Sequence, residues 1–182
     1  MDAGSRRWLD SGRAMTESLL TALTSAVKAT LTAQFDTAFI GLLQYGSTVS
    51  PPLKPATDVD LFAIVEPLPK GRAARRDLAL AIEDAPQVRA ALQALKLAGH
   101  HLQVSLVLRN LAEASKFSPL YLDWTDQSRI LHDSKGLLAT VIQKTQDYIR
   151  DSGARKVRHG LLWYWDMGQG KTANDLFDIG WL

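Results

Sequence analysis

The sequence predicts an α+β domain in which helices pack largely on one face of a sheet. Three observations predict it: stripes of apolar residues at helical spacing, three apolar runs of strand length, and a Gly-Ser turn between the first two runs. With 182 residues, 46% hydrophobic and 22% charged, the chain fits one domain over 1–182 with a sizeable core.

The first expected elements are a helix and two strands. Residues 1–13 are polar and are expected to be irregular and partly disordered. A helix is expected over 15–34, because apolar residues recur there every fourth position. The continuous apolar run 38–45 predicts a central strand, and 58–65 predicts a second one.

Two further helices and a strand follow. Helical spacing resumes after a basic stretch at Lys70 to Arg76, breaks at Pro86 and ends at Gly99. The basic stretch is expected to be a solvated helix start, with a polyanion site as the alternative. The alternating run 101–109 predicts the third strand.

The remainder is expected to hold short pieces and a C-terminal extension over 135–182. A short helical or irregular piece is expected over 111–124, then a short strand near 129–132 and a helix over 135–151. The run 156–167 predicts a strand or hairpin whose aromatic residues are expected in a core or interface, with a base-stacking platform as the alternative. The GQGK in the tail lacks the spacing of a phosphate loop.

The stretch from Gly46 to Asp60 carries the most chemistry. Side chains alternate along a strand, so Asp58 and Asp60 should project to the same side. Two adjacent carboxylates repel unless a cation lies between them, and such oxygen ligands suit Mg²⁺ with substrate phosphates. Gly46-Ser47 offers backbone N–H groups and a hydroxyl to phosphate oxygens. Ordinary turn chemistry is the alternative interpretation.

This pattern resembles a known family. Gly46-Ser47, ten residues and Asp58-Val59-Asp60 are similar to the signature of DNA polymerase beta-type nucleotidyltransferases, above all the minimal, MNT-like members. The resemblance implies the polymerase beta-like fold, with a mixed sheet and helices mainly on one face. It also implies Asp58 and Asp60 as catalytic metal ligands, and Gly46 and Ser47 as the phosphate grip. The implied cofactor is Mg²⁺ or Mn²⁺, and the implied substrate is a nucleoside triphosphate, ATP being the expected one.

Two positions depart from the family pattern. Relatives often carry Arg and a second Gly in the loop 48–57, whereas Lys54 is the only basic residue there and becomes the candidate phosphate ligand. Relatives also place a third carboxylate on the later strand, where Ser105 stands in this chain. The other acids that might complete the site are Glu66, Glu113 and Asp123.

The functional expectation is therefore transfer of a nucleoside monophosphate to an acceptor hydroxyl, with release of pyrophosphate. The alternative is a degenerate nucleotidyltransferase fold that binds nucleotide or acts as a toxin–antitoxin-type regulatory partner. The acceptor, whether small molecule, RNA or protein, stays open, as does a partner protein. The chain has no cysteine and no apolar run of membrane-spanning length, so we expect no membrane span and a cytoplasmic location.

Overall fold

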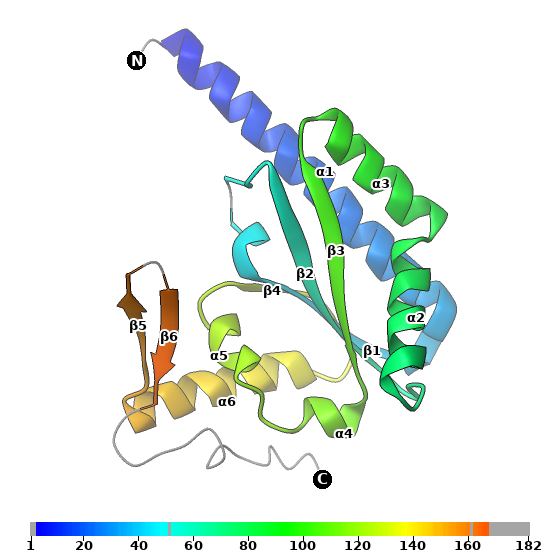
Figure 1. Ribbon diagram of the computed structural model, residues 1–182, viewed down its shortest axis with the longest axis vertical. Helices are drawn as coiled ribbons and strands as arrows, with labels where there is room; N and C mark the ends of the chain where they lie inside the picture. The colour runs from blue at the N-terminus through cyan, green and yellow to red at the C-terminus, as the bar shows by residue number, and fades with distance from the viewer. Residues whose placement is uncertain (1–2, 51, 161, 168–182) are drawn as a thin grey trace.

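The computed structural model describes residues 3–50, 52–160 and 162–167 (Figure 1). Six α-helices, two short 3₁₀ helices and six strands are found in these ranges. The helices are α1 (Ala3–Phe35), η1 (Asp36–Ala38), η2 (Gly46–Thr48), α2 (Arg72–Glu83), α3 (Pro86–Leu97), α4 (Leu111–Ala114), α5 (Leu120–Trp124) and α6 (Leu137–Ser152). The strands are β1 (Phe39–Tyr45), β2 (Ala56–Val65), β3 (His101–Arg109), β4 (Ser128–Asp133), β5 (Arg155–His159) and β6 (Leu162–Asp166).

The main sheet is four-stranded and mixed, as expected, with the order β3-β2-β1-β4. Strand β1 pairs antiparallel with both β2 and β4, while β2 and β3 run parallel. The parallel pair requires a crossover, and α2 and α3 supply it. The apolar run that predicted a central strand is β1, which is buried along nearly its whole length.

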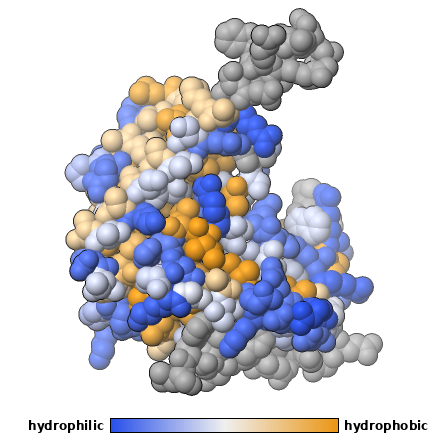
Figure 2. Space-filling model, turned by 180° about the vertical axis from the view of Figure 1, so that it is seen from behind, coloured by the Kyte–Doolittle hydropathy of each residue, from blue (hydrophilic) through white to orange (hydrophobic). Residues whose placement is uncertain are grey.

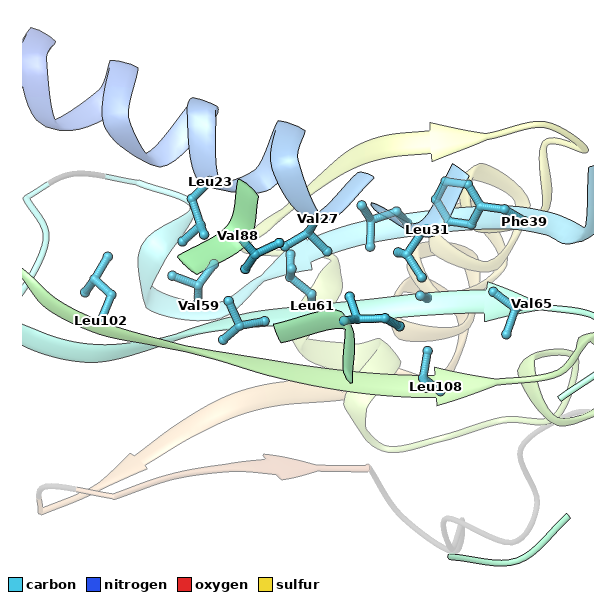
Figure 3. Packing of buried hydrophobic residues seen from close by; sticks show 14 of the residues in the cluster. Leu23, Val27, Leu31, Phe39, Val59, Leu61, Val65, Val88, Leu102 and Leu108 are labelled. Atoms are coloured by element: carbon cyan, nitrogen blue, oxygen red, sulfur yellow. The ribbon is translucent and has the colours of Figure 1, made fainter. Parts of the chain in front are cut away.

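One face of the sheet is covered by α1, α2 and α3. Leu23, Val27 and Leu31 of α1 are fully buried against this face. Figure 3 shows them pointing toward the strands beneath, from which Val59 and Leu61 of β2 point back. The four-residue stripe in the sequence therefore marks the buried side of α1.

The opposite face is covered by α6 together with the short helices α4 and α5. Its core includes Phe62 of β2, Tyr121 and Trp124 of α5, and Leu138 of α6. Most of the helical length thus lies on the first face, as expected, and a smaller second core covers the other (Figure 1).

Helix α1 begins much earlier than the apolar stripe. The stretch up to Arg13, expected to be irregular, is helical from Ala3. No proline interrupts it, and glycine lowers helix stability by only about 1 kcal/mol. Arg13 pairs with Glu17 one turn on at 3.1 Å, and Thr16 contacts His100 beyond α3 at 3.1 Å.

Strands β5 and β6 form a separate two-stranded hairpin beside the main domain (Figure 1). Its aromatic residues were expected in a core or interface. Trp163 and Tyr164 are 58% and 53% exposed, so the expectation of a core is wrong for these two residues, while an interface stays a prediction. A two-stranded hairpin has too little apolar surface to bury both of its faces.

The surface mixes hydrophilic and hydrophobic residues. The face in Figure 2 carries apolar residues near its middle, bordered by hydrophilic ones. Among the described helices none is long and apolar enough to cross a membrane. The GQGK segment lies outside the described residues.

Candidate functional site

The Gly-Ser turn ends β1 and is held from both sides. Gly46 has φ +77°, which favours glycine, and its N–H donates to the carbonyl of Gln127 at 3.1 Å. Beneath the turn, the buried amide of Gln44 donates to Thr48, and Arg129 of β4 donates to the Gln44 oxygen at 2.7 Å. The turn is therefore fixed by strand β4 and by a buried amide.

Asp58 and Asp60 lie on the same face of β2. Val59 and Leu61 belong to the core under α1, whereas Phe62 belongs to the core under α5 and α6. Because successive side chains alternate, the two aspartates share the Phe62 side, beyond the end of its core. The sequence prediction of a shared face is confirmed.

Asp60 reaches the Gly-Ser turn. Its Cα pairs with that of Tyr45 in the β1–β2 ladder, one residue before the turn. A Cβ atom added to Gly46 would lie 3.0 Å from Oδ2 of Asp60, closer than nearly all real contacts of that kind. Asp60, one member of the acidic pair, therefore lies against the bend predicted from the sequence.

The electrostatics of this contact favour a bound cation. Burial raises the pKa of Asp60, and the nearby charge of Asp58 raises it further, while a hydrogen bond from the Ser105 side chain opposes both. Burial also raises the pKa of Tyr45 to about 12, and the charge of Asp60 acts in the same direction. Negative charge at Asp60 is thus costly until a positive group approaches it.

Ser105 occupies the position that the sequence comparison assigned to it. It pairs directly with Asp60 in the parallel β2–β3 ladder, and its side chain hydrogen-bonds the Asp60 carboxylate. The residue beside the acidic pair is therefore a neutral hydroxyl, where the family pattern has a third acid.

The other acids considered from the sequence are engaged elsewhere. Glu66 accepts from the N–H of Leu111, and it follows β2 at roughly 20 Å of extended chain from Asp60. Glu113 forms a two-pronged pair with Arg75, both bonds 2.8 Å long. Asp123 accepts from Lys156 at 3.0 Å and from the indole N–H of Trp165 at 3.1 Å.

The remaining predicted ligands differ in their placement. The exposed hydroxyl of Ser47 lies 3.4 Å from that of Thr57, just before the acidic pair. Because the Gly46 N–H is already bonded to Gln127, the groups left for a phosphate are the Ser47 hydroxyl and the N–H groups that open the 3₁₀ turn. Lys54 is exposed in the loop before β2, next to Pro55, whose carbonyl accepts from His101.

The residues present fit one hard divalent cation. They offer two carboxylates on one face and a neighbouring hydroxyl, a donor set suited to Mg²⁺ or Mn²⁺ with phosphate oxygens completing the coordination. No group of three or more histidine or acidic residues suited to a metal occurs in the described ranges, so substrate or water would have to supply the remaining ligands.

Sequence reasoning missed the residues that support the site from β1 and from the segment before β4. Tyr45 stands beside Asp60, and Gln127 accepts the Gly46 N–H. Tyr45 could have been found, because it directly precedes the glycine at the end of the predicted strand. Gln127 carries no signal in the sequence, since its main-chain carbonyl makes the contact.

No protein-family model matches the chain, and no curated protein matches it. Several solved structures resemble it distantly. A toxin–antitoxin structure with AMP-PNP shares 15% identity over 70% of this chain and 90% of that one, with a TM-score of 0.41. A structure of the tri-AMPylated Shewanella oneidensis HEPN toxin in complex with MNT antitoxin shares 16% identity over 74% and 92%, at 0.40.

A third structure, the toxin–antitoxin MntA–HepT, shares 15% identity over 74% of this chain and 92% of that one, at 0.38.

Proposed function

We propose that the protein is a nucleotidyltransferase that depends on Mg²⁺ or Mn²⁺ and uses a nucleoside triphosphate, with ATP as the first candidate. The contact between Asp60 and Gly46, with Asp58 on the same face, carries the proposal. It joins a carboxylate pair that favours a cation to a turn that presents a hydroxyl and backbone N–H groups. These groups match the two halves of a metal–triphosphate complex.

In this proposal each group has a defined task. The Ser47 hydroxyl and the backbone N–H groups of η2 after Gly46 bind the outer phosphates. Asp58 and Asp60 hold the cation against the phosphate chain. The cation, when bound, neutralises charge on the triphosphate and on the departing pyrophosphate. The acceptor oxygen forms a bond to the α-phosphorus, the bond from that phosphorus to the bridging oxygen breaks, and the hydroxyl proton leaves to solvent.

Catalysis of this kind depends on positioning and on charge neutralisation. The test uses α-³²P-labelled ATP, GTP, CTP and UTP with Mg²⁺, and measures pyrophosphate release together with label on the protein and on added RNA. We expect metal-dependent release that is lost when Asp58→Asn is combined with Asp60→Asn. Asp77→Asn, at an exposed position on α2, is the matched control.

Ser105 favours a second candidate function. A hydroxyl at the third position suits binding better than turnover, so the chain would be a nucleotide-binding module or a regulatory partner of the toxin–antitoxin type. Calorimetry with Mg²⁺ and a non-hydrolysable ATP analogue separates the two. Binding that needs Asp58 and Asp60, without pyrophosphate release, identifies the module. If none of the four triphosphates binds with either metal, the transferase and the nucleotide-binding module are both excluded, and the regulatory partner is the function that is left.

A further inference from the structure

The β5–β6 hairpin combines basic and aromatic side chains outside the core. Lys156 and Arg158 of β5 pair in the ladder with Trp165 and Trp163 of β6, so the four side chains share one face of the hairpin. The Arg158 guanidinium lies over the Trp163 ring at 5.6 Å, and the Lys156 ammonium over the Trp165 ring at 5.8 Å. This face is therefore a ladder of two cation–aromatic pairs.

The root of the hairpin is fixed to α5. Lys156 bonds Asp123 and Asp126 at 3.0 and 3.3 Å, and the Trp165 indole bonds Asp123. Nearer the tip, the Nε of Arg158 donates to the Gly160 carbonyl within the hairpin itself. Trp163 is thus exposed on a hairpin whose other end is anchored to the main domain by Lys156 and Trp165.

The root also adjoins the candidate site. Asp126, which Lys156 contacts, directly precedes Gln127, whose carbonyl holds the N–H of Gly46. Asp58, Asp60 and the helix α5 that anchors the hairpin lie on the same side of the main sheet. Figure 1 shows the hairpin standing on that side.

We propose that this face of the hairpin binds a single-stranded nucleic acid, with bases stacked on Trp163 and backbone phosphates near Arg158. Bases stack on any exposed aromatic ring, and arginine supplies both a phosphate ligand and a cation–π contact. Two residues on one strand face stand about 7 Å apart, so Trp163 and Trp165 lie one after the other between the tip and the anchor on α5. If the proposed transfer reaction holds, the bound strand supplies the acceptor hydroxyl.

The hairpin suits this ligand better than the basic start of α2. There Arg75 is occupied by Glu113, and Arg76 bonds Asp77 at 2.9 Å. Those pairings leave fewer cations for a polyanion. No exposed tryptophan, tyrosine or phenylalanine accompanies them, because the large aromatic side chains that are exposed among the described residues are Trp163 and Tyr164.

The test measures fluorescence anisotropy of labelled twelve-nucleotide U-RNA and T-DNA with the whole protein. We expect binding that weakens with salt, and a loss of at least about five-fold in Trp163→Ala, the effect of one stacked base. Arg158→Ala should reduce the slope of log affinity against log salt by about 0.7. Leu162→Ala, 73% exposed on the other face of the hairpin, is the matched control. The ratio of RNA to DNA affinity shows whether the hairpin prefers ribose or deoxyribose in the bound strand.

Equal affinity of Trp163→Ala and the parent protein, or stronger binding of a duplex than of the single strand, would overturn the proposal. Self-association that Leu162→Ala and Trp163→Ala both abolish, with no oligonucleotide binding, would make the hairpin a protein interface instead. The result is separable from the transfer reaction, because binding is measured without triphosphate. The Asp58→Asn, Asp60→Asn protein should lose the transfer reaction and still bind the oligonucleotide.

Discussion

Ser105 is the residue that bears most directly on whether the site transfers a nucleotide or only binds one. It stands beside Asp60 in the ladder, and hydrogen bonding by its hydroxyl lowers the pKa of the Asp60 carboxyl without adding a charge. An acid at this position would repel Asp60 in the absence of a metal and would offer a second cation a ligand in its presence. An acid at position 105 should therefore lower the stability without metal and enlarge the stabilisation that a bound metal produces.

We predict that Ser105→Asp lowers the melting temperature in EDTA and enlarges the gain produced by Mn²⁺ or Mg²⁺. Replacing a hydrogen bond to a charged group by repulsion should cost about 1–3 kcal/mol without metal. Differential scanning fluorimetry in EDTA and at several metal concentrations measures both effects. Ser105→Asn, which keeps a donor and adds no charge, is the control. An unchanged metal response in Ser105→Asp would place this position outside the metal site.

At the scale of elements, the Gly-Ser turn depends on two different constraints at Gly46. One is the backbone, whose φ of +77° strains any residue with a side chain. The other is the carboxylate of Asp60, whose Oδ2 would lie only 3.0 Å from a Cβ atom added to Gly46. Gly153 at the end of α6 has a similar φ of +71° and open space around the missing Cβ, so it separates these two costs.

We predict that Gly46→Ala destabilises the protein more than Gly153→Ala does. The conformational penalty is about 1–2 kcal/mol at both positions, and Gly46 adds the displacement of Asp60. Urea unfolding with equal slopes for the two variants gives the difference. Gly46→Ala should also lose its metal-dependent gain in stability, and Gly153→Ala should keep it. Equal destabilisation would mean that Asp60 moves aside freely.

The elements were predictable from the sequence wherever burial alone decides them. The stripe of α1 and the run of β1 each reflect one buried surface, so periodicity located them. The hairpin was predicted as an element, but its exposure was not. Aromatic residues usually mark a core, and only the three-dimensional structure shows that Trp163 is 58% exposed.

In the candidate site, too, some features were predictable from the sequence and others were not. Alternation placed Asp58 and Asp60 on one face, and their contact with Gly46 follows from the register between β1 and β2. The supports of the turn were not predictable. The Gln127 carbonyl comes from a main-chain contact across the fold, and the buried Gln44 amide resembles any polar residue at a strand end.

At the scale of the whole molecule, two carboxylates link stability to pH in opposite ways. The pKa of Asp60 is raised above its ordinary value of 3.8, so its contribution is fully present below that value and is lost as the pH rises through the raised pKa. Hydrogen bonds and charge from Arg75 lower the pKa of Glu113 below its ordinary value of 4.5, although its own burial acts the other way. Its contribution is present above 4.5 and is lost as the pH falls through the lowered pKa.

A cation should cancel the loss at Asp60 alone. We predict that the gain in melting temperature from Mg²⁺ is smallest near pH 4 and grows as the pH rises through the raised pKa of Asp60, because the metal and a proton compete for the same carboxylate. At a concentration a hundred times the dissociation constant the gain corresponds to about 2.7 kcal/mol, or several degrees for a chain of this size.

Asp60→Asn should remove this gain at every pH. In EDTA it should raise the free energy of unfolding by less than about 1 kcal/mol, because one partner of a repelling pair becomes neutral. Glu113→Gln is the matched control, since it should flatten the acid limb of the stability profile and leave the metal response intact. Melting curves from pH 4 to 8, with EDTA and with Mg²⁺, measure all three proteins. A metal gain that survives in Asp60→Asn and disappears in Glu113→Gln would place the cation at the Arg75–Glu113 pair, and the acidic pair beside Gly46 would then have no metal to hold.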